Sequence, residues 1–270
     1  MKTSRSTQIL IVIFFVGLGL LLYPSVSNYW NSFHATRAIA SYTEAVTEID
    51  NARYEQLWQE AVAYNQRLYG KKDRWVLSDA ERAEYESLLD VSGTGIMGYI
   101  EIPKIRVSMP IYHGVDESVL QVAVGHMESS SLPVGGEGTH CLLSGHRGLP
   151  SAKLFTDLDQ LVEGDIFLLQ VLDEVLTYEV DQIRIVLPND LQDLELIPGE
   201  DLCTLITCTP YGINSHRMLV RGHRIETQPD APRVSADALQ LEPVLVAPLI
   251  AAPILLILLL ILLIPQKKGK

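Results

Sequence analysis

Hydrophobic and polar positions divide the chain into two uncharged runs near its ends and a long polar segment between them. The runs cover residues 9–23 and 244–264. A helix of about 20 apolar residues crosses the hydrocarbon of a bilayer, so the second run predicts a membrane span. The first run is shorter and leaves two interpretations open. We favour an uncleaved anchor over a signal peptide that is cleaved at the small residues Ser25 to Ser27.

Basic residues lie on the outer side of each run. They are Lys2 and Arg5 before the first, and Lys267, Lys268 and Lys270 after the second. Positive charge stays on the cytoplasmic side of a membrane. We therefore expect both termini in the cytoplasm. Residues 1–27 would form a cytoplasmic tail and the N-terminal membrane anchor or signal, and residues 265–270 a basic cytoplasmic tail. The middle of the chain is expected to lie outside the cell.

The first part of this outer segment, residues 28–92, is predicted to be a helical extension. Apolar residues recur at helical spacing from about residue 34 to residue 68, and Gly70 is a plausible terminator. Ser78 and Glu81 have the spacing of a capping box, which predicts a shorter second helix through Leu89.

After residue 92 the pattern changes to short apolar runs separated by glycine and proline. Eight strands are predicted: 96–102, 105–112, 140–143, 166–171, 175–180, 183–187, 202–207 and 218–225. Short strands at this spacing with few helices favour a mainly β fold, a closed barrel over residues 93–226. A proline-rich linker, 227–243, leads into the second membrane run.

Composition narrows the range of functions. The 270 residues carry a net charge of −12, and the segment between the membrane runs carries −17. An acidic surface repels phosphate, so nucleic acid is excluded as a partner. The three cysteines form no C-x-x-C pair, and no histidine spacing matches a metal motif, so we expect no metal and no cofactor.

Three residues could form a nucleophilic site. Cys208 ends a predicted strand and precedes a turn-rich loop, whereas Cys141 and Cys203 read as small core residues. Among seven histidines, His146 is the best placed, because it follows a strand end and has glycines on both sides. Arg217 begins the next strand and could stabilise an oxyanion. A structural role for Cys208 and a solvent-exposed role for Arg217 remain as alternatives.

These residues lie in segments that resemble the sortase family. The segments are TLITCTPYGINSHRMLVRGHRI, LLSGHRGLPSAKLFTDLDQL, GYIEIPKI and MPIYHG. The second membrane run and the helical extension are similar to the pilin-polymerising class C sortases. The resemblance implies a sortase barrel in which Cys208 is the nucleophile, His146 the acid/base and Arg217 the oxyanion or substrate-positioning residue.

The implied reaction is a transpeptidation. Cys208 would cleave an LPXTG-like sorting signal between Thr and Gly, form a thioester, and pass the acyl group to a lysine amine of another pilin subunit. The expected partners are thus pilin precursors and the membrane. A cell-wall-anchoring sortase, a cysteine peptidase that uses water, and a non-catalytic membrane-tethered scaffold remain alternatives.

The class C resemblance also implies a lid over the site. Asp73 and Trp75 stand where the family has an Asp-Pro-aromatic motif, with Arg74 in place of the proline. Asp73 would pair with Arg217, and the ring of Trp75 would cover Cys208. The alternative is a tryptophan that merely packs on the helix pair.

Overall fold

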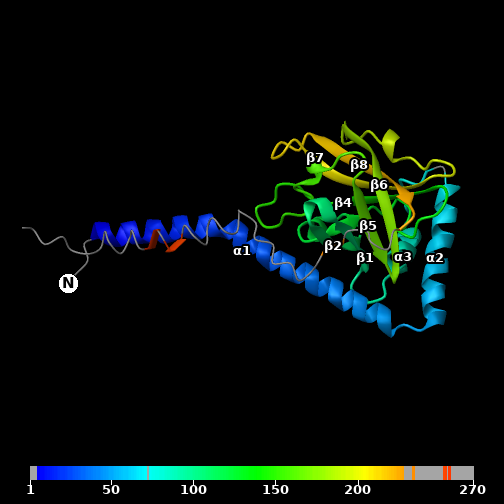
Figure 1. The fold of residues 1–270 in the computed structure, drawn as a ribbon, viewed down its shortest axis with the longest axis horizontal. Coiled ribbons are helices and arrows are strands. Elements are labelled where there is room, and N and C mark those ends of the chain that lie inside the picture. The colour runs from blue at the N-terminus through cyan, green and yellow to red at the C-terminus, as the bar shows by residue number, and fades with distance from the viewer. Residues whose placement is uncertain (1–4, 72, 228–232, 235–251, 254, 257–270) are drawn as a thin grey trace, which may run out of the picture.

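The computed structural model describes residues 5–71, 73–227, 233–234, 252–253 and 255–256. A long helix, α1, leads to a β-barrel flanked by further helices (Figure 1). The helices are α1 (Arg5–Glu48), α2 (Asn51–Tyr69), α3 (Asp79–Ser87) and α4 (Glu117–Leu120), with short 3-10 turns η1 (Pro103–Ile105), η2 (Leu158–Gln160) and η3 (Gln192–Leu194). The strands are β1 (Ile96–Ile102), β2 (Val107–His113), β3 (Val124–His126), β4 (Thr139–Ser144), β5 (Ile166–Val171), β6 (Glu174–Val186), β7 (Asp201–Thr209) and β8 (His216–Ile225).

The eight strands close into a barrel in the order β1-β2-β3-β4-β7-β8-β6-β5. The β2–β3 and β4–β7 pairs are parallel, and the other pairs are antiparallel. The predicted closed eight-stranded barrel is confirmed, but its strands differ in part. Strand β3 was not predicted, and the two expected strands 175–180 and 183–187 are one strand, β6, with a register shift between Val180 and Gln182.

Local capping sets the boundaries of α2 and α3. The predicted helix over residues 34–68 is wrong as a single element, because Asp50 accepts a hydrogen bond from the Arg53 amide (2.8 Å) and starts a new helix. Gly70 follows the end of α2, as expected. The capping box of Ser78 and Glu81 is present, and α3 ends at Ser87 rather than at Leu89.

Among the described residues, one helix is long and apolar enough to cross a membrane, and its candidate span is Gln8–Glu48 within α1. Its apolar window is almost wholly exposed. An anchor and a signal sequence would both give this result, so the two interpretations of residues 9–23 stay open. The second predicted span, 244–264, lies almost entirely outside the described residues.

Candidate active site

The site lies on the outer face of the barrel over β4, β7 and β8. Alternate residues of a strand point to opposite faces. Cys203 and Leu205 of β7 belong to the main core inside the barrel, whereas Ile206 belongs to a separate outer cluster. Cys208 is two residues beyond Ile206, so its side chain shares the outer face.

Strand pairing brings Arg217 to Cys208. In the antiparallel β7–β8 pair, Cys208 is the register partner of Arg217, and Ile206 is the partner of Leu219. Leu219 belongs to the same outer cluster as Ile206. Arg217, two residues from Leu219, therefore points to the same face as Cys208, as expected for two strands that pair as a hairpin.

His146 reaches the same rim from β4. The parallel β4–β7 register ends with Ser144 opposite Ile206. It is continued by the Gly145 amide, which donates to the Ile206 carbonyl (3.0 Å), and by Thr207 Oγ1, which donates to the Gly145 carbonyl (2.8 Å). One further residue places His146 at the level of Cys208. A side chain on Gly145 would meet the Phe155 ring at 2.6 Å, so glycine is required before the histidine.

In the described part of the chain, no hydrogen bond joins Cys208 to His146 or Arg217. The Arg217 guanidinium donates instead to the carbonyls of Asn214 (3.3 Å) and His216 (3.2 Å). His146 Nε2 lies 3.4 Å from Glu117 Oε2. Catalytic hydrogen bonds are often long in a free enzyme and tighten in the substrate complex, so the arrangement is compatible with nucleophilic chemistry.

Accessibility separates Cys208 from the other two cysteines. Cys141 and Cys203 are buried, as predicted, and are register partners inside the barrel. Cys208 is half-buried. Burial holds the pKa of the Cys203 thiol well above its usual value, which keeps that thiol protonated. Among the three thiols, Cys208 is the one within reach of a substrate.

The expected lid residues lie between α2 and α3, and they contact the barrel differently from the prediction. Asp73 is exposed, and no ion pair joins it to Arg217 in the described structure. Trp75 packs against the outer cluster of Leu142, Leu194, Ile206 and Leu219. The ring therefore lies on the face that carries Cys208, next to Ile206.

Arg74, which stands where the resemblance leads us to expect a proline, fixes this loop on the barrel. Its side chain is buried, and its guanidinium donates to the carbonyls of Ser129 (3.1 Å) and Leu194 (2.6 Å) and to Glu195 Oε2 (3.2 Å). The guanidinium carbon also lies 4.0 Å from the centroid of the Trp75 ring. Five donors in a planar group allow one arginine to make all these contacts.

His140 of β4 contacts Glu195, a residue to which Arg74 also binds. It is fully buried, with Nδ1 2.9 Å from the Glu195 carbonyl and Nε2 2.7 Å from Thr204 Oγ1. A neutral ring satisfies both contacts when Nδ1–H donates and Nε2 accepts from the hydroxyl. Burial lowers the pKa of His140 to about 4, and the nearby charges of Arg74 and Arg221 act in the same direction.

Sequence reasoning did not find Glu117 or the contacts of Arg74. Glu117 lies 29 residues before His146 in the one-turn helix α4, and Gln121 Nε2 donates to its other carboxylate oxygen (3.0 Å). These hydrogen bonds to Gln121 and His146 lower the pKa of Glu117. No local pattern in the sequence predicts the contact between Glu117 and His146, because 29 residues separate them.

Comparison with known proteins identifies related chains. Residues 100–225 match the model of the sortase domain. The chain is 31% identical to sortase A of Streptococcus agalactiae over 117 residues, which are 42% of this chain and 47% of that protein, so the match spans about half of this curated relative.

Solved structures match over a larger part. Sortase C1 of Streptococcus agalactiae is 50% identical with a TM-score of 0.69, and the alignment covers 71% of this chain and 100% of that one. Sortase C of Streptococcus pneumoniae is 44% identical with a TM-score of 0.62, and the alignment covers 71% of this chain and 97% of that one.

Proposed function

This chain belongs to the sortase family, in the pilin-polymerising class C, and from that premise we propose that it is a membrane-anchored extracellular cysteine transpeptidase that joins pilin subunits. One observation carries the proposal. Cys208 and Arg217 are register partners on the outer face of the barrel, at the rim to which β4 delivers His146. The structure of the related pneumococcal sortase C is described in terms of pilin substrate specificity, which supports pilins as the substrate class.

In the first half-reaction, the Cys208 thiolate attacks the Thr carbonyl carbon of an LPXTG-like signal. The carbonyl electron pair moves to oxygen, and Arg217 turns from its loop carbonyls to hold this oxyanion. The oxyanion then collapses, the Thr–Gly bond breaks, and His146 donates a proton to the leaving amine. The product is a thioester between Thr and Cys208, and the Gly-containing peptide leaves.

In the second half-reaction, the neutral amine of a pilin lysine attacks the thioester carbonyl. His146 accepts the proton that the amine loses, and the Cys208 thiolate departs. An isopeptide bond between Thr and lysine results. The thioester retains the energy of the cleaved peptide bond, so the joining step needs no ATP. Water must be excluded in the meantime, which is the role we propose for the loop of Arg74 and Trp75 as a lid.

Residues 9–23 of α1 would anchor the enzyme, and residues 244–264 would supply a second span, with both termini in the cytoplasm. Anchoring would place the site beside membrane-held pilin precursors and raise the effective concentration of both.

An adduct experiment tests the nucleophile. The chain is incubated with an LPXTG-type peptide, and the thioester is sought by mass spectrometry on peptides that contain Cys208. We expect the adduct on Cys208 and its loss in Cys208→Ala. The buried Cys141 and Cys203 serve as internal controls, and an adduct that persists in Cys208→Ala would remove the assignment.

Product analysis with and without an added lysine-containing peptide then tests the acceptor. A transpeptidase yields the joined product when the amine is present. Release of the same free acid at the same rate with and without amine would favour a cysteine peptidase.

A further inference from the structure

Helix α1 connects the membrane run to the barrel without an interruption. It is helical from Arg5 to Glu48, and Pro24 lies inside it. Tyr23, Tyr29, Trp30 and Phe33, which follow or end the apolar run, are each more than half exposed. Tryptophan and tyrosine concentrate where a membrane meets water. The outer headgroup layer is therefore expected around residues 28–33 of α1.

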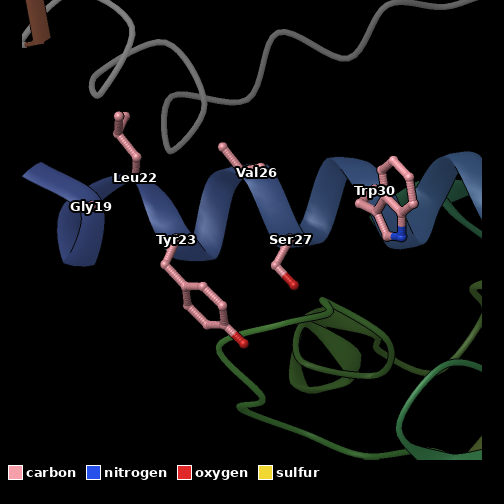
Figure 2. A pocket seen from close by; sticks show the side chains of 6 residues that line it. All are labelled: Gly19, Leu22, Tyr23, Val26, Ser27 and Trp30. Carbon is pink, nitrogen blue, oxygen red and sulfur yellow. The ribbon is translucent and has the colours of Figure 1, made fainter.

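At the expected headgroup layer, α1 is hydrogen-bonded to one loop of the barrel. Asn31 Nδ2 donates to the Ser151 carbonyl (2.8 Å), and the Lys153 amide donates to Asn28 Oδ1 (2.9 Å). Both contacts lie in the loop that follows His146 and precedes η2. Figure 2 shows Tyr23 and Ser27 on the side of α1 that faces a green loop of the barrel, and Leu22 and Val26 on the opposite side.

The opposite end of the barrel is held further along the same helix. Tyr42 donates from its hydroxyl to the Met97 carbonyl (3.1 Å) and accepts from the Leu172 amide (2.7 Å), beside the β5–β6 turn. Tyr42 is fourteen residues beyond Asn28, a rise of about 21 Å along α1. Helix α1 thus runs along the barrel from the end with the His146 loop to the end with the β5–β6 turn.

The β7–β8 loop, which follows Cys208, lies at the end near the membrane. A side chain on Gly148 would meet the Tyr211 ring at 2.8 Å, so this ring rests on the loop that α1 holds. Figure 1 shows the β7–β8 loop projecting toward the N-terminal part of α1. Tyr211 and Ile213 at its tip are exposed, 61% and 72% respectively. An aromatic ring and an aliphatic side chain at a loop tip suit the boundary between headgroups and acyl chains.

We propose that the β7–β8 loop contacts the outer leaflet of the bilayer, so that the rim carrying Cys208, His146 and Arg217 opens at the membrane surface. The partner of this surface is the lipid bilayer itself. The net charge of −17 between the membrane runs gives no attraction to anionic lipid. The contact is therefore made by burial of the apolar side chains of Tyr211 and Ile213. Helix α1 determines the distance of the barrel from the membrane.

The inference rests on the anchoring part of the proposed function and deepens it. A sorting signal that precedes a membrane segment emerges at the headgroup layer. A rim held at that level meets such a signal as it leaves the bilayer, whereas a rim at the far end of the barrel would stand about 21 Å further away.

Depth measurement on the full chain tests the orientation. In a Cys208→Ala background, Ile213→Cys is labelled with an environment-sensitive fluorophore and the chain is inserted into phosphatidylcholine vesicles that contain a headgroup nitroxide lipid. The matched control carries the label at Glu174→Cys, an exposed position at the start of β6, directly after the β5–β6 turn. Both sites are exposed, so folding is preserved, and Cys141 and Cys203 are too buried to react.

We expect quenching at position 213 to exceed quenching at position 174 several-fold. Equal quenching at the two sites, stronger quenching at position 174, or recovery of the chain free of the vesicles would overturn the inference. Cleavage of a soluble LPXTG-type peptide by the unsubstituted chain in the same vesicles tests the proposed chemistry separately. Cleavage without differential quenching removes the orientation alone, and differential quenching without cleavage removes the chemistry alone.

Discussion

At the scale of single residues, a buried arginine replaces the expected contact of the lid. Asp73 is exposed, while the Arg74 guanidinium is buried with three hydrogen-bond acceptors and the Trp75 ring. Removing one partner from a buried hydrogen bond costs about 1–3 kcal/mol for each group left unpaired. Arg74 therefore fixes this loop on the barrel more firmly than Asp73 can.

Substitutions in this loop distinguish the contribution of Arg74 and Trp75 from that of Asp73. We expect Arg74→Ala and Trp75→Ala to speed alkylation of Cys208 by a bulky thiol reagent several-fold, because the loop leaves the outer face more often. Asp73→Ala is the matched control and should leave the rate unchanged. Measured rate constants that rise for Asp73→Ala but not for Arg74→Ala would contradict this account.

His140 predicts how stability depends on pH. Its pKa is lowered to about 4 in the folded chain and is about 6.5 in an unfolded one. Between these values the unfolded state binds more protons, so the free energy of unfolding falls as the pH drops from about 6.5 to about 4. The loss reaches about 3 kcal/mol by linkage.

Urea titrations at pH 7 and pH 5 provide the measurement. His140→Gln removes the titration, so its unfolding free energy should depend less on pH than that of the unsubstituted chain. His223→Gln, at a half-exposed position on β8, is the control and should retain the full dependence. Parallel pH profiles for His140→Gln and the unsubstituted chain would rule out this role.

At the scale of elements, α1 and the barrel are joined by a buried hydroxyl. Tyr42 is 1% exposed and its oxygen bonds both β1 and the β5–β6 turn. Tyr42→Phe leaves the Met97 carbonyl and the Leu172 amide unpaired, which should reduce the free energy of unfolding by about 2 kcal/mol.

Denaturant unfolding of the chain in detergent measures this loss. Tyr69→Phe, which removes a hydroxyl from a half-exposed ring, is the control and should change stability little. Equal effects of the two substitutions would show that the Tyr42 hydroxyl does not join the elements.

Alternation of apolar and polar residues places most strands correctly, but it divides one strand into two and misses another. Strand β6 reads as two because Asp181 interrupts its apolar pattern at the register shift, where the carboxylate pairs with Arg221 (2.9 Å). Strand β3 has three residues and takes its pairing from β2 and β4 rather than from its own pattern. The expected total of eight was reached because these two errors cancel.

At the scale of the whole molecule, the proposed anchoring by residues 9–23 would act by raising the local concentration of enzyme and substrate. Tethering enzyme and substrate to one bilayer turns their encounter into a near-intramolecular event. A chain that begins at residue 28 should therefore act about 100-fold more slowly than the full chain on a bilayer-tethered LPXTG-type peptide.

Both forms should cleave the soluble peptide at the same rate, which controls for folding of the shortened chain. Initial rates on vesicles measure the difference. A shortened chain as fast as the full chain on the tethered peptide would show that α1 does not act as a tether.

The sequence by itself determined the barrel, the caps of Gly70 and Ser78, the core positions of Cys141 and Cys203, and the family. These follow from alternation, capping and motif spacing, which are local properties of the chain. The tertiary structure alone decided that the face shared by Cys208 and Arg217 is the outer one, that Glu117 meets His146, and that Arg74 rather than Asp73 secures the loop between α2 and α3. Such contacts join residues far apart in the chain, and they exist only once closure of the barrel fixes the register of its strands.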